Sequence, residues 1–79
     1  MRVSVKLFAT LTHYGPGVKA AEPFDVDLPE NARVIDLIRL LNIPPVEAHV
    51  VFINNIIVRH DTPIKSGDNI GIFPQVAGG

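Results

Sequence analysis

The residues best suited to chemistry are Gly78 and Gly79, because the sequence ends on these two glycines. Neither has a Cβ, so this end of the chain can lie fully extended and pass through a slot too narrow for any other residue. An α-carboxyl group with a pKa of about 3.5 is ionised at neutral pH and is therefore a poor electrophile. We expect the chemistry to take place on the Gly79 carboxylate itself, after activation by adenylation.

Composition excludes several other functions. The sequence contains no cysteine, so it offers no disulfide, zinc–thiolate site or cysteine nucleophile. Its net charge is −1 and it has no basic run, which argues against nucleic acid or an anionic membrane as a partner. The first residues alternate polar with apolar instead of forming a long apolar segment, so we predict neither a signal peptide nor a membrane span, and a cytoplasmic protein.

The remaining residues with catalytic side chains lack a suitable spacing. His13, His49 and His60 are scattered, without the pairing that metal ligands show, so we predict no metal site. Asp25 and Asp27 lie on the same face of a predicted strand, as a catalytic pair of carboxylates could. A solvated strand face is the simpler interpretation of these two residues.

Alternation at period two, together with β-branched residues, predicts the strands. In the first of them, Val3, Val5 and Leu7 should face the core. Asn54-Asn55 predicts a tight hairpin, because asparagine tolerates the positive φ that two-residue turns require. The predicted strands cover residues 2–8, 22–28, 49–53, 56–58 and 69–73.

One clear helix is predicted, opening at 31–34 and ending at Asn42 before two prolines. Its apolar stripe is formed by Val34, Leu37, Ile38 and Leu41. Arg33 would be a poor N-cap, so we expect the helix to depend on packing of this stripe. A shorter helical turn is predicted over residues 9–14.

The order of these elements predicts an α+β fold in which one helix packs across a mixed sheet. It resembles the β-grasp fold of ubiquitin-like proteins. Several short motifs are similar to the bacterial and archaeal sulfur carriers, a family that includes the small subunit of molybdopterin synthase and the thiamine sulfur carrier. They are Leu7-Phe8-Ala9, Ile53-Asn54, Pro63-Ile64, Gly67-Asp68, Phe73-Pro74 and Val76-Ala77-Gly78-Gly79. The first of them, with the long connection after it, is most similar to the molybdopterin synthase subunit.

This resemblance implies a carrier protein rather than an enzyme, with no bound cofactor. A partner enzyme would use ATP to adenylate Gly79, and a sulfur donor would convert the adenylate into a thiocarboxylate. A large synthase subunit would then receive the sulfur for cofactor biosynthesis, first of all for the molybdopterin precursor. A thiazole precursor, as in the thiamine pathway, is the alternative acceptor. Outside this class, a ubiquitin-like modifier joined to lysines through Gly79 and a plain interaction domain stay open.

The resemblance divides the chain into a β-grasp domain, residues 1–74, and a flexible tail, residues 75–79. The tail consists of Gln75, Val76, Ala77, Gly78 and Gly79. Five extended residues reach about 17 Å, which is enough to enter the active site of another protein.

Three phenylalanines are predicted to form a partner-binding surface beside the root of the tail. If Val3, Val5 and Leu7 face the helix, the alternation turns Phe8 outward, and the same rule turns Phe73 outward in the last strand. Phe52 joins them if the apolar run 50–53 has the same parity. The alternative is that this run is read with the wrong parity and that Phe52 lies in the core.

Overall fold

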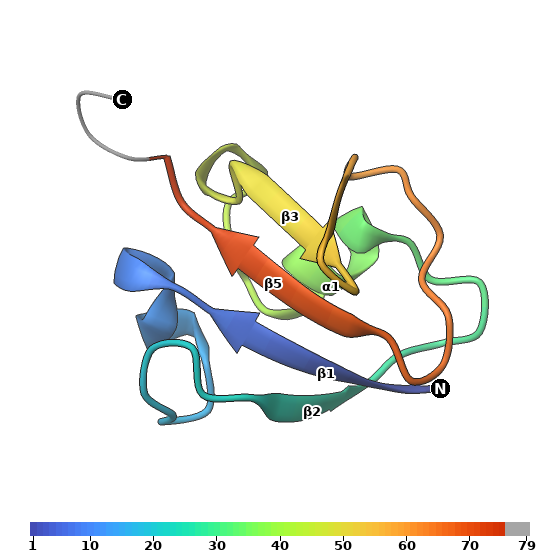
Figure 1. The fold of residues 1–79 in the computed structure, drawn as a ribbon, viewed down its shortest axis with the longest axis horizontal. Coiled ribbons are helices and arrows are strands. Elements are labelled where there is room, and N and C mark those ends of the chain that lie inside the picture. The colour runs from blue at the N-terminus through green and yellow to red at the C-terminus, as the bar shows by residue number, and fades with distance from the viewer. Residues whose placement is uncertain (76–79) are drawn as a thin grey trace.

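The computed structural model describes residues 1–75, in which five strands form one mixed sheet (Figure 1). The spatial order is β2-β1-β5-β3-β4, so the last strand lies at the centre. β1 and β5 run parallel, and the other neighbouring pairs run antiparallel. The strands are β1 (Arg2–Leu7), β2 (Phe24–Asp27), β3 (Val50–Ile53), β4 (Ile56–Val58) and β5 (Asn69–Phe73).

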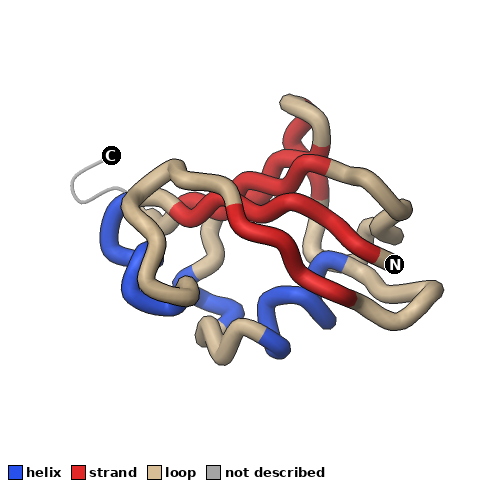
Figure 2. The backbone as a smooth tube through the Cα atoms, turned by 90° about the horizontal axis from the view of Figure 1, so that it is seen from below, coloured by secondary structure: helices blue, strands red, loops and turns tan. Residues whose placement is uncertain are grey.

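The helical segments lie on one side of this sheet (Figure 2). They are the α-helix α1 (Val34–Leu40) and two 3₁₀ segments, η1 (Ala9–Tyr14) and η2 (Pro45–Glu47). One α-helix across a mixed sheet, with the first and last strands as parallel neighbours, is the β-grasp arrangement. The fold predicted from the sequence is confirmed.

The core fills the space between the sheet and α1. Val5, Val34, Leu37, Ile38 and Ile72 are completely buried in it. The strands contribute alternate residues to this layer, since β1 and β5 each bury every second side chain. The opposite face of the sheet has no helix among the described residues, so its side chains meet solvent.

The hairpin between β3 and β4 forms as predicted. Asn54 and Asn55 have φ of 51° and 70°, the left-handed region that the two-residue turn needs. The Asn54 side chain also accepts a hydrogen bond from the Asn69 amide at 3.0 Å and donates one to Asp68 at 3.1 Å. These bonds join the hairpin to the start of β5.

The helix and three strands differ from the prediction in their bounds. α1 begins only at Val34, because Asn31 has a φ of 67° and Arg33 is extended. The N-terminus of α1 is better capped than expected, because the Asp36 carboxylate accepts a hydrogen bond of 2.8 Å from the Arg33 amide. The helix also ends at Leu40, before the predicted Asn42. β1, β2 and β3 are shorter than predicted, and β3 is not buried throughout: Val50 and Phe52 are half-buried.

Within residues 1–75, no helix is long and apolar enough to cross a membrane.

Candidate functional site

The C-terminal tail leaves the sheet from its central strand. β5 ends at Phe73, Pro74 is half-buried behind it, and Gln75 is exposed. Proline lacks the amide that would extend the ladder, which explains why the strand stops here. The other predicted tail residues, 76–79, lie outside the described residues, so their predicted roles stay predictions.

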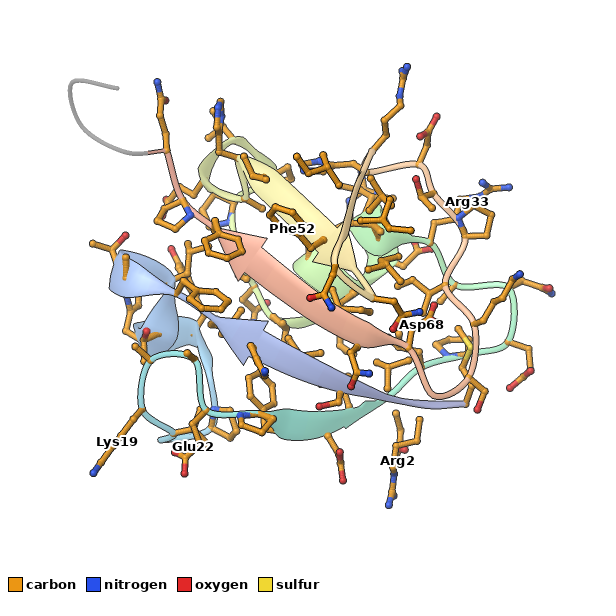
Figure 3. The ribbon with its side chains drawn as sticks, viewed as in Figure 1. Arg2, Lys19, Glu22, Arg33, Phe52 and Asp68 are labelled. Carbon is orange, nitrogen blue, oxygen red and sulfur yellow. The ribbon has the colours of Figure 1, made fainter. Side chains whose placement is uncertain are left out.

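Phe8, Phe52 and Phe73 meet on the sheet face opposite α1. The Phe8 and Phe73 rings stack with centroids 4.0 Å apart and planes 8° from parallel. Phe52 meets the Phe73 ring edge-on, with centroids 5.4 Å apart. All three side chains are half-buried, and Figure 3 shows Phe52 in front of the sheet with α1 behind it. We call this surface the aromatic face, and the partner-binding role predicted for it stays a prediction.

Strand register explains why the three rings meet. Val51 and Ile72 are buried and pair with each other, which turns Phe52 and Phe73 to the other face. Phe8 follows β1 and is held beside β5 by a hydrogen bond from its amide to the Ile72 carbonyl, 3.2 Å long. Phe52 therefore does not lie in the core.

Gly71 lies under the rings, a role that the sequence analysis missed. It pairs with Phe52 on one side and with Lys6 on the other. A Cβ added at Gly71 would lie 3.4 Å from Phe8 Cε2 and 3.6 Å from Phe73 Cε1, so any longer side chain would meet the two rings. Glycine inside a strand is the signal that could have indicated this close approach.

The aromatic face borders two hollows. One has a volume of about 240 Å³, and the rings, Gly71 and a polar rim of Ser4, Lys6, Asn55 and Asn69 line it. The other lies on the tail side of the rings and is lined also by His49, Val50, Pro74 and Gln75. Ile57, opposite Phe52 in the register, is 67% exposed and extends the apolar surface to the edge of the sheet.

The polar end of this sheet face carries an ion pair. Arg2 lies opposite Asp27, and its guanidinium donates hydrogen bonds of 2.9 and 3.3 Å to the two carboxylate oxygens. This hydrogen bonding, and then the positive charge of Arg2, lower the pKa of Asp27. The same hydrogen bonding, and then the negative charges of Asp27 and Asp25, raise the pKa of Arg2. Asp25 and Asp27 are both exposed, which fits a solvated strand face better than a catalytic pair.

We predict that Arg2→Ala raises the pKa of Asp27 toward its ordinary value. The ion pair with Arg2 lowers the pKa of Asp27 in the folded protein. The pair therefore stabilises the fold above the ordinary pKa of about 3.9, and this stabilisation is lost as pH falls through the folded-state pKa of Asp27. NMR titration of the carboxyl carbon measures the change. Arg59→Ala, at the separate pair with Asp61, is the control. An unchanged Asp27 pKa in Arg2→Ala would contradict the prediction.

The histidines do not converge. Among residues 1–75, no group of three or more His, Cys, Asp or Glu side chains could hold a metal ion. His60 instead forms a 2.7 Å hydrogen bond through Nε2 with the Ala48 carbonyl, and His13 contacts the Tyr14 ring.

The sheet topology, with α1 across one face, defines a ubiquitin-like β-grasp protein. The chain belongs to the ThiS family, whose model matches residues 5–79. This match confirms the resemblance to ubiquitin-like sulfur carriers drawn from the sequence. None of the curated proteins compared with the chain matches it.

Solved structures agree with this assignment. SAMP1 from Haloferax volcanii is 25% identical, with a TM-score of 0.71 over 100% of both chains. A putative molybdopterin converting factor subunit 1 from Pyrococcus furiosus is 29% identical, with a TM-score of 0.70 over 95% of this chain and 98% of that one. A complex of subunits 1 and 2 of the molybdopterin-converting factor from Helicobacter pylori matches at 23% identity and a TM-score of 0.54, with 100% of both chains covered, and supports the fold alone.

Proposed function

We propose that this protein is a sulfur carrier that delivers sulfur as a thiocarboxylate on Gly79. A partner enzyme joins the Gly79 carboxylate to the α-phosphate of ATP, and pyrophosphate leaves. A sulfide equivalent from a donor then attacks the acyl adenylate, AMP leaves, and the thiocarboxylate remains. The carrier binds no cofactor of its own, and the catalytic residues belong to its partners.

Membership of the ThiS family is the observation that carries this proposal, because the family model includes the terminal Gly78-Gly79. The absence of cysteine from the sequence supports it as well. A thiocarboxylate is a soft nucleophile, and this chain has no thiol of its own to compete with it.

The molybdopterin precursor is the sulfur acceptor that we propose. It is favoured by the likeness to subunit 1 of a molybdopterin converting factor, at 29% identity over nearly the whole chain. In this reading the aromatic face docks on a large synthase subunit while the tail enters its active site. Aromatic side chains that become buried on binding are common anchors of protein–protein interfaces.

A second candidate function is a ubiquitin-like modifier. It is favoured by the match to SAMP1, a small archaeal modifier protein. In this function the activated Gly79 carbonyl would be attacked by a lysine amine of another protein, and the product would be an isopeptide.

Mass spectrometry after incubation with ATP, an activating enzyme and a sulfur donor distinguishes the two functions. A carrier exchanges one oxygen for one sulfur, whereas a modifier yields conjugates of higher mass. The only sulfur in the starting sequence is that of Met1, so fragmentation can assign the new sulfur to Gly79 without ambiguity. An unchanged mass in the presence of a competent activating enzyme would contradict both functions.

A further inference from the structure

The hollow beside the aromatic face has the size of a side-chain pocket. Its volume is about 240 Å³, below the range of roughly 300–1,000 Å³ that is typical of sites for small molecules. Phe8, Phe52 and Phe73 provide apolar walls, and Gly71, which has no side chain, lies beneath the rings of Phe8 and Phe73. A single large side chain of a docking protein fits this space better than a nucleotide or a cofactor.

Lys6 is the charged residue at the hollow. Among residues 1–75 it is the one ionisable residue in the lining, which contains no carboxylate from this part of the chain. Of the described residues, His49 is the one ionisable residue that lines the adjoining hollow on the tail side. The protein as a whole has a net charge of −1, so the positive charge of Lys6 is local to the lining of this hollow.

Lys6 differs from Arg2 and Arg59, the two arginines that form ion pairs within residues 1–75. Arg2 is paired with Asp27 on the same sheet face, and Arg59 is paired with Asp61. Within residues 1–75 the Lys6 ammonium forms no ion pair. Lys6 pairs with Gly71 in the register, and both residues line the hollow.

We propose that the protein docking on this face presents a large apolar side chain to the hollow and, on the same segment, a carboxylate to Lys6. The inference rests on the proposed docking role of the aromatic face and adds the chemistry of the partner. The apolar side chain supplies burial against the rings, and the carboxylate supplies the charge complementarity that fixes orientation and partner choice.

Titration with a small molecule that carries an apolar ring and a carboxylate tests this partner chemistry. The probe is 3-phenylpropionate, and its uncharged match is 3-phenylpropanamide. We expect both to shift the amide resonances of Lys6, Gly71 and Phe73, with the acid binding up to about fivefold more tightly, the usual limit for an exposed ion pair. Equal affinity for the two fragments, shifts elsewhere on the protein, or no binding of either would overturn the proposal.

Substitutions assign the preference to Lys6. Lys6→Gln should remove the preference for the acid, and Lys6→Glu should reverse it. Lys19→Glu makes the same charge change in the loop before β2, far from Phe52 in Figure 3, and should keep it. An equal effect of Lys19→Glu would show that net charge is responsible and would overturn the assignment.

The result is independent of the sulfur chemistry. The titration requires no ATP, activating enzyme or sulfur donor, and every variant retains Gly79. A failure of thiocarboxylate formation would therefore leave the fragment result unchanged, whereas equal binding of acid and amide would reject the partner chemistry in a protein that still carries sulfur.

Discussion

Deletion of Gly79 is expected to abolish thiocarboxylate formation and to leave the fold intact. The reaction uses the Gly79 carboxylate, and a chain that ends on Gly78 presents its carboxylate one residue, about 3.5 Å, short of the partner's reactive centre. Stability should not change, because the described core is built from residues between Val3 and Ile72. Mass spectrometry of the sulfur product and thermal unfolding measure the two effects.

Gly78→Val tests whether the partner's active site has a narrow slot that admits only glycine, in addition to requiring the full length of the tail. A β-branched side chain next to the terminus should block passage through a slot that accepts only glycine, so we expect loss of the product here too. Lys19→Val introduces the same side chain in the loop before β2, outside the tail and the aromatic face, and should retain the reaction. Undiminished sulfur transfer by the chain that lacks Gly79 would rule out this residue as the functional centre.

The direction of the strands' side chains could largely be predicted from the sequence. β1 and β5 alternate polar or small residues with large apolar ones, so burial of one set determines the exposure of Phe8 and Phe73. The run Val50–Ile53 is apolar at every position and has no such signal. Its parity is determined by pairing with β5, a tertiary contact, which is why Phe52 could be predicted only by assuming the sheet order.

The surroundings of the rings could not be predicted, because they depend on residues from different strands. Gly71 matters because the Phe8 ring lies above it, where a larger side chain would meet the ring. Phe8 lies there because β1 and β5 pair in parallel. Lys6 likewise reads as an ordinary exposed residue until the register places it opposite Gly71. The hydrogen bond from the Arg33 amide to the Asp36 carboxylate could not be predicted either, because it depends on where the helix begins.

Two neighbouring substitutions are expected to act on different properties: Phe73→Ala should weaken partner binding, and Ile72→Ala should lower stability. Phe73 lies on the aromatic face, so its loss should weaken binding of the activating enzyme or the large subunit by about 2 kcal/mol, close to 30-fold. Ile72 is completely buried, so its truncation should lower the free energy of unfolding by about 2–5 kcal/mol. Calorimetric binding titrations and denaturant unfolding measure the two quantities.

Each of the two variants is the control for the other. Phe73 is half-buried against Phe8 and Phe52, so Phe73→Ala should cost less stability than the roughly 3–5 kcal/mol of a fully buried Phe→Ala. Ile72→Ala should bind its partner normally under conditions in which it is fully folded, since its side chain faces α1. If Phe73→Ala instead unfolds easily and binds normally when folded, the aromatic face is a structural layer of the sheet and partners dock elsewhere.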